Sequence, residues 1–101
     1  FSQVIVTVSL THHRKADFER FEAWVAAHDE ITDCVATGGG MDYVMKIICP
    51  SLAAFQTMMQ SMVEAELGID RYMTYIATRV IKAARPNIAK LAGPVPRDRT
   101  V

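Results

Sequence analysis

Hydrophobic residues recur along this chain with two periods, and each change of period predicts a new element. Residues 3–10 alternate, with every even-numbered position from 4 to 10 apolar, which is the pattern of a half-buried strand. Apolar positions then recur at a spacing of three or four from Phe18 to about residue 28, which predicts an amphipathic helix. Residues 31–37 and 43–49 have the composition of two further strands.

The second half of the chain repeats this succession of a helix and a strand. Ser51 follows a proline and is a favourable N-terminal cap for a helix over residues 52–66, and Gly68 suits the end of that helix. Within this helix, one apolar stripe contains Leu52, Phe55, Met59, Met62 and Val63. Residues 71–82 alternate again and predict a fourth strand.

The predicted order is strand, helix, strand, strand, helix, strand. This order is the ferredoxin-like βαββαβ arrangement of the α+β class, in which two helices cover one face of a four-stranded antiparallel sheet. We expect residues 1–82 to form this domain. Residues 83–101 contain three prolines and end in polar positions, so we expect a loosely attached C-terminal tail.

The second face of the predicted sheet is also apolar. Val44 and Ile48 lie on the side opposite Met45, and Met73 and Tyr75 belong to the same uncovered face. A soluble monomer rarely exposes an apolar area of this size, so we expect a homodimer that stacks two sheets about a twofold axis. The alternative is that the tail folds back over this face.

Composition narrows the classes of function. Eleven basic and eleven acidic residues give a formal net charge of zero, which argues against nucleic-acid binding by this segment alone. Cys34 and Cys49 lie in strand-like runs without a CxxC or Cys/His cluster, so we expect neither a metal site nor a disulfide. With no apolar run near membrane-spanning length and no signal-peptide pattern, we expect a cytoplasmic protein that does not contact the membrane.

The segment Gly38–Tyr43, GGGMDY, is the most informative local feature. Three consecutive glycines exceed the needs of a hairpin turn, and bare backbone N–H groups can surround a carboxylate. Asp42 accepts hydrogen bonds only and could hold an ammonium group, so the segment could bind an amino-acid zwitterion. The alternative is a flexible hairpin beside an ordinary surface aspartate.

The other residues with reactive or aromatic side chains favour structural roles. His12 and His13 are adjacent in a polar break, which is typical of solvated loop residues. The methionines between residues 58 and 62 and Trp24 suit the core or an interface. The chain contains no nucleophile–base pair, phosphate-binding loop or metalloprotease motif, so we expect no catalytic residues, no cofactor and no enzymatic activity.

Several short matches along the chain share the spacing of one family. Gly39, Asp42 and Tyr43 match the family's Gly-x-x-Asp-Tyr hairpin, and residues 44–46 match the apolar-apolar-Lys sequence that follows it. Residues 67–69 are similar to a Gly-Val junction, and Thr74 matches a Thr in the fourth strand. In this combination, residues 1–82 resemble the C-terminal effector-binding (RAM) domain of Lrp/AsnC transcriptional regulators.

The resemblance implies homodimers that assemble into tetramers or octamers and bind an amino acid or a related metabolite between dimers. It also implies that DNA is bound through a helix-turn-helix domain preceding Phe1, so this chain is either an excised fragment or a stand-alone module. Gly40, Met41 and Tyr72 depart from the family's usual residues and leave the effector's identity open. The ligand-binding residues that the resemblance implies are Gly38, Gly39, Gly40, Met41, Asp42, Thr74 and Tyr75.

Two other classes share this predicted topology, since fold alone does not define function. A small dimeric α+β-barrel enzyme of the monooxygenase type would need polar catalytic groups between the sheet and the helices, whereas the histidines here lie outside that region. An ACT-like regulatory domain would also bind amino acids, but the Gly-x-x-Asp-Tyr hairpin fits it less well.

Overall fold

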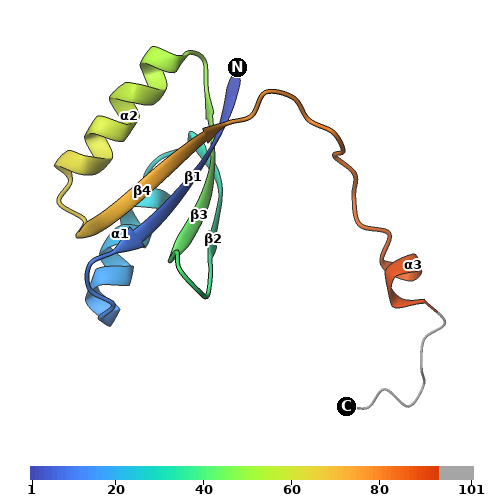
Figure 1. Cartoon of the computed structure of the whole chain (residues 1–101), viewed down its shortest axis with the longest axis horizontal. Helices are drawn as coiled ribbons and strands as arrows, with labels where there is room; N and C mark the ends of the chain where they lie inside the picture. Colours follow the sequence, from blue (N-terminus) through green and yellow to red (C-terminus); the bar gives the residue numbers. More distant parts are fainter. Residues whose placement is uncertain (94–101) are drawn as a thin grey trace.

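A computed structural model describes residues 1–93 and places two helices against one face of an antiparallel sheet (Figure 1). A segment after the last strand, residues 77–93, extends away from this body and is called the arm below. The elements are β1 (Ser2–Leu10), α1 (Lys15–Ala26), β2 (Ile31–Ala36), β3 (Tyr43–Cys49), α2 (Leu52–Glu64), β4 (Ile69–Ile76) and α3 (Ile88–Ala92).

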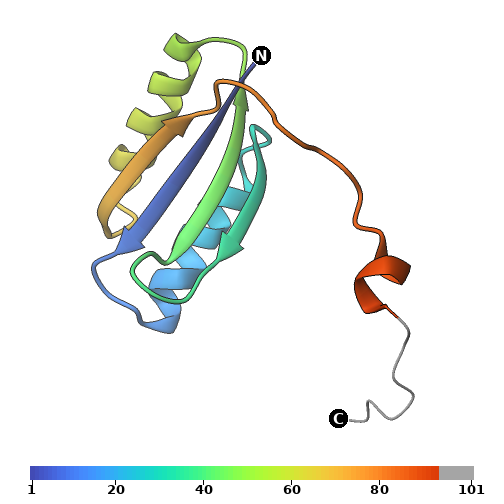
Figure 2. The same ribbon diagram turned by 45° about the vertical axis from the view of Figure 1, so that its right-hand side comes forward.

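The four strands lie in the order β2-β3-β1-β4, and every pair is antiparallel. The two central strands, β1 and β3, pair from Ser2 opposite Cys49 to Val8 opposite Tyr43. Both long helices lie on the same side of the sheet, and the opposite side faces outward (Figures 1 and 2). The predicted ferredoxin-like βαββαβ fold is confirmed.

The core lies between the sheet and the two helices. Alternation in the strands sends the even positions of β1 and the odd positions of β3 toward the helices, as their burial shows. Phe21 of α1 and Met62 of α2 meet them there and are completely buried. The buried hydrophobic residues are Val4, Val6, Val8, Leu10, Phe21, Tyr43, Met45, Ile47, Cys49, Phe55, Met58, Met59, Met62 and Leu67.

The outer face of the sheet remains uncovered. Met73 and Tyr75 are about half exposed there, at 48% and 50%, and pair through β4 with the central strand β1. The arm does not fold back over this face, because Ile88 and Leu91 of α3 are 68% and 76% exposed. The alternative in which the tail covers the sheet is therefore not the arrangement of the described chain.

The fourth strand is shorter than predicted: it spans residues 69–76, not 71–82. Within the described chain, the last β1–β4 pair is Val4 with Ile76, and Ala77 N then donates to Gln3 O at 2.9 Å. Residues 77–82 continue the alternation that predicted a strand, but they form no strand in the described chain. Residues 94–101 of the predicted tail lie outside the described residues.

The boundaries of α2 also differ slightly from the prediction. Ser51 caps the helix as expected, because its Oγ accepts from Ala54 N at 3.1 Å. The helix ends at Glu64, and Glu66 takes a positive φ of 54°, two residues before Gly68 with a φ of 73°. Gly68 therefore shapes the turn into β4 and does not directly end the helix.

A buried carboxylate fastens the start of α1. The side chain of Asp17 is 4% exposed and accepts hydrogen bonds from Arg14 Nε and Arg20 Nη2, both at 2.8 Å, and from Arg14 N at 3.0 Å. The Arg14 guanidinium is the main cause that holds the pKa of Asp17 far below its usual range, against the opposing effect of burial.

We predict that Asp17 contributes to acid sensitivity. Because its pKa is depressed by folding, its stabilising contribution is complete above the unfolded pKa near 3.8 and is lost as the pH falls further, through the folded pKa. Asp17→Asn should lower the thermal midpoint at pH 7 and flatten its decline below pH 4, as measured by circular dichroism. Glu19→Gln, an exposed change on the same helix, is the control and should leave both properties unchanged.

Candidate functional site

The glycine segment forms the hairpin between β2 and β3, as predicted. Of its three glycines, only Gly39 has a positive φ, at 97°, so the other two are not required by backbone conformation. A Cβ added to any of the three would meet nothing within 4 Å. Thr37 Oγ1 donates to Met41 O at 2.7 Å and ties the hairpin together. Within the described chain, the N–H groups of residues 38–41 make no hydrogen bond.

Asp42 connects this hairpin to the end of β1. Its Oδ2 accepts from Leu10 N at 2.7 Å and lies 3.0 Å from His13 Nε2, and its own N–H donates to Val8 O at 2.9 Å. The hydrogen bond from Leu10 N, followed by the contact with His13, lowers the pKa of Asp42 despite partial burial. Its Oδ1 has no hydrogen-bond partner among residues 1–93.

His13 lies in the loop after β1 and is exposed, as the sequence analysis expected, but it also has a partner in the hairpin. The side chain is 56% exposed, but its Nε2 contacts Asp42 and its ring lies 5.7 Å, between centroids, from that of Phe18. His13 therefore contacts the predicted ligand-binding residue Asp42, which the sequence analysis did not anticipate. No local signal identifies it, because 29 positions separate it from Asp42 and only the tertiary fold brings the two together.

Tyr43, which follows Asp42, belongs to the core and not to the exposed hairpin. Its ring lies 4.6 Å from that of Phe21, and its hydroxyl donates to Glu22 Oε2 at 2.6 Å. Burial and the neighbouring Glu22 carboxylate raise the pKa of Tyr43 well above its usual value. Tyr43 thus anchors the C-terminal end of the hairpin to α1.

Thr74 and Tyr75 do not join the hairpin within one chain. Thr74 pairs with the buried Val6 and faces α2, whereas Tyr75 pairs with Ile5 on the outer face of the sheet. Neighbouring residues of a strand point to opposite faces of its sheet. The strand predicted over residues 71–82 therefore already implied that Thr74 and Tyr75 lie on opposite faces. The seven predicted ligand-binding residues therefore fall into three places: the hairpin, the helix side of β4 and the outer face.

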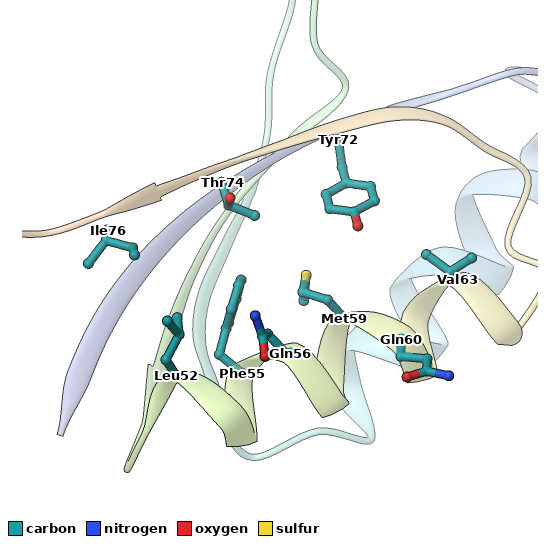
Figure 3. Close-up of a pocket in the computed structure, with 9 residues that line it drawn as sticks. All are labelled: Leu52, Phe55, Gln56, Met59, Gln60, Val63, Tyr72, Thr74 and Ile76. Carbon is teal, nitrogen blue, oxygen red and sulfur yellow. The ribbon is translucent and has the colours of Figure 1, made fainter.

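Thr74 belongs to an apolar groove between α2 and β4, with a volume of about 490 Å³ (Figure 3). A second hollow of about 320 Å³ shares Val63 and Tyr72 with it and continues past Glu66 and Asp70. Leu52 and Val63, predicted on the buried stripe of α2, are instead 51% and 55% exposed along this groove. The groove is lined by Leu52, Phe55, Gln56, Met59, Gln60, Val63, Tyr72, Thr74 and Ile76.

Two further properties concern residues 1–93 as a whole. In this range, no group of three or more His, Cys, Asp or Glu side chains is arranged to hold a metal ion. No helix in the same range is long and apolar enough to cross a membrane.

The fold and the hairpin together define a structural class: a ferredoxin-like domain with an exposed glycine hairpin beside a carboxylate. Residues 3–87 match the family model described as the Lrp/AsnC ligand binding domain. The chain belongs to this family. The expectation of a regulatory domain, and not of an enzyme, is confirmed by this membership and by the transcriptional regulators among its relatives.

Two relatives are regulatory proteins that are longer than this chain. The chain is 37% identical over 86 residues to the transcriptional regulatory protein DoeX of Halomonas elongata, covering 85% of this chain and 54% of that protein. It is 26% identical over 91 residues to the leucine-responsive regulatory protein of Salmonella typhimurium, covering 88% of this chain and 56% of that protein. The chain therefore spans about half the length of these relatives.

Solved structures show the same fold. An AsnC family transcriptional regulator from Agrobacterium tumefaciens superposes with a TM-score of 0.75 at 21% identity, covering 99% of this chain and 60% of the other. The regulator NMB0573 of Neisseria meningitidis, solved as a complex with L-Met, gives 0.73 at 23% identity and covers 81% of this chain and 53% of the other.

We predict that Asp42 stabilises the domain as well as its hairpin. Asp42→Ala leaves Leu10 N–H without its acceptor in a partly buried position and should cost about 1 kcal/mol of unfolding free energy. Hydrogen exchange should show faster exchange of the Leu10 amide, while Asp29→Ala, an exposed control, should change neither quantity. An unchanged Leu10 exchange rate in Asp42→Ala would contradict the assigned hydrogen bond.

Proposed function

We propose that this chain is the effector-binding and oligomerisation domain of an Lrp/AsnC-type transcriptional regulator, with an amino acid or similar metabolite as its effector. The observation that carries the proposal is that two kinds of free group lie in one hairpin. Among residues 1–93, the N–H groups of residues 38–41 make no hydrogen bond, and Oδ1 of Asp42 has no partner. The N–H groups suit a carboxylate, and Asp42 suits an ammonium group. The L-Met complex of the Neisseria regulator supports this ligand class.

In this proposal, Asp42 has a separate role for each oxygen. Oδ2 fastens the hairpin to Leu10 and His13, which fixes the direction of the carboxylate. Oδ1 then remains for the effector. The ligand thus meets a group that is already oriented, and preorganisation of this kind reduces the entropy lost on binding.

The rest of the site would come from a neighbouring copy. Within one chain, Thr74 and Tyr75 lie on different faces of β4, and the hairpin joins strands at the other side of the sheet. We propose that sheets of two copies stack through the outer face to form a dimer, and that dimers assemble further into tetramers or octamers. Gly38, Gly39, Gly40, Met41, Asp42, Thr74 and Tyr75 contribute to effector sites between copies.

Regulation would follow from linkage. An effector bound between copies stabilises one assembly over another, and so changes the spacing of attached DNA-binding domains. Those domains would belong to a part of the parent protein outside this chain, which spans about half the length of its relatives. We place this activity in the cytoplasm, where the regulated DNA lies.

We predict that a few amino acids stabilise the domain. At a free concentration of one hundred times its Kd, an effector should add about 2.7 kcal/mol, or about 10 °C of thermal midpoint for a domain of this size. The measurement is a thermal-shift panel of the twenty amino acids. Asp42→Asn should abolish the shift, because the side chain no longer carries the negative charge that an ammonium group needs. Its amide oxygen can still accept from Leu10 N–H, so the hairpin should keep its position.

The control for this panel is Asp29→Asn, which removes an exposed carboxylate away from the hairpin and should keep the response. If no amino acid shifts the wild-type midpoint, the amino-acid function of the hairpin is wrong. If Asp42→Asn responds like the wild type, the effector binds elsewhere.

We predict that the outer face carries the dimer. Tyr75→Glu places a charge on a side chain that is half exposed in a single copy, so the fold should persist while the stacked sheets separate. Sedimentation velocity should show more monomer, with a dimer dissociation constant raised tenfold or more. This corresponds to a loss of about 1.4 kcal/mol or more of association free energy. Thr57→Glu, on the exposed side of α2, should leave the assembly unchanged.

A further inference from the structure

The zero net charge of the whole chain hides a strong separation of charge. Residues 1–76 contain ten acidic and five basic side chains, a formal charge of −5. The arm, residues 77–93, contains four basic side chains and no acidic one, a formal charge of +4. An acidic body and a basic arm attract one another, and the attraction is strongest at low ionic strength.

The arm also exposes apolar side chains. Val80 and Ile81 are largely exposed, and Ile88 and Leu91 lie three positions apart on α3, so they share one side of this short helix. Asn87 caps α3, because its Oδ1 accepts from Lys90 N at 3.0 Å. A capped helix with one apolar side and a basic residue beside it has the form of a docking segment, yet it stands clear of the body in both views (Figures 1 and 2).

The groove between α2 and β4 has the complementary properties. Its walls are mostly apolar, with polar groups from Gln56, Gln60, Thr74 and the Tyr72 hydroxyl, and its continuation passes Glu66 and Asp70. A short helix that places an apolar side in such a groove is a recurring mode of peptide recognition. The acidic end of the groove suits the basic residues that flank Ile88 and Leu91.

The arm begins directly after Ile76, which lines this groove, but it does not follow the groove. Ala77 N donates to Gln3 O, which holds the first arm residue beside β1, and the chain then runs away from α2 (Figures 1 and 2). The twelve residues from Ala77 to Ile88 can span at most about 40 Å, enough to reach a neighbouring molecule.

We propose that the arm of one copy docks α3 in the α2–β4 groove of a second copy. Ile88 and Leu91 occupy the apolar part of the groove, and Arg85 and Lys90 lie toward Glu66 and Asp70. This interface is separate from the outer face of the sheet, since the groove opens on the helix side. It therefore gives each copy a second means of association besides the stacked sheets.

The test uses the full chain with a photo-crosslinking amino acid, p-benzoylphenylalanine, at position 91. Isotopically heavy and light chains are mixed in denaturant, refolded together and irradiated, and the linked peptides are identified by mass spectrometry. We expect links from position 91 to residues 52–63 or 69–76, with heavy–light pairs among them. Heavy–light pairs require two copies, whereas an arm that returned to its own groove would give only like-labelled pairs.

Charge and groove variants make the test specific. Arg85→Glu with Lys90→Glu should lower the yield of heavy–light links at least fivefold, and adding Glu66→Lys with Asp70→Lys should restore it. Val63→Glu, at an exposed groove position, should also remove the links, while Lys15→Glu, a basic residue on α1, should not. Circular dichroism of each variant checks that the body remains folded.

Three results would overturn the proposal. Like-labelled pairs alone would place the arm in its own groove, and links confined to the outer face would make the arm a cover for the sheet. If reversing the arm's charge weakens retention of the chain on duplex DNA but leaves the crosslinks unchanged, the arm is a nucleic-acid contact instead.

Discussion

A four-stranded sheet has two faces, and two helices can cover only one of them; the rest of this structure depends on that constraint. The covered face forms the core, in which the even positions of β1 and the odd positions of β3 meet Phe21 and Met62. The other face keeps Met73 and Tyr75 half exposed. Burying apolar area is the dominant favourable contribution to folding and association, so the same alternation that builds the core also creates a surface for a second copy.

The hairpin between β2 and β3 is held from outside its own strands. Glycine leaves its backbone groups accessible, and Gly39 alone needs the conformation that glycine favours. Its orientation instead comes from Asp42, whose Oδ2 bonds Leu10 N and contacts His13 at the end of β1. If the effector binds at Asp42, as we propose, its position therefore depends on the end of β1, because one oxygen of the carboxylate is fixed there.

The edge strand β4 separates two surfaces with different chemistry. Alternation directs Thr74 toward α2 and Tyr75 toward the outer face, so one strand contributes to the groove and to the proposed dimer interface. The arm begins where β4 loses its partner, and it carries positive charge away from a body with an excess of acidic residues. The two contacts that we propose between copies therefore differ in kind: the outer face is apolar and flat, and the groove is concave with an acidic end.

The order of elements, most of the buried positions and the location of the glycine hairpin followed from the sequence, because periods of two and of three to four residues are local properties of the chain. The placement of the hairpin glycines and of Asp42 as effector-binding residues remains a prediction. Only the tertiary structure decided three matters: β4 pairs with β1 as far as Ile76, His13 reaches Asp42 across 29 positions, and Leu52 and Val63 line a groove although their spacing matches a buried stripe. Each depends on which segments meet in space, and helical or strand periodicity shows which residues share a face but not what lies opposite that face.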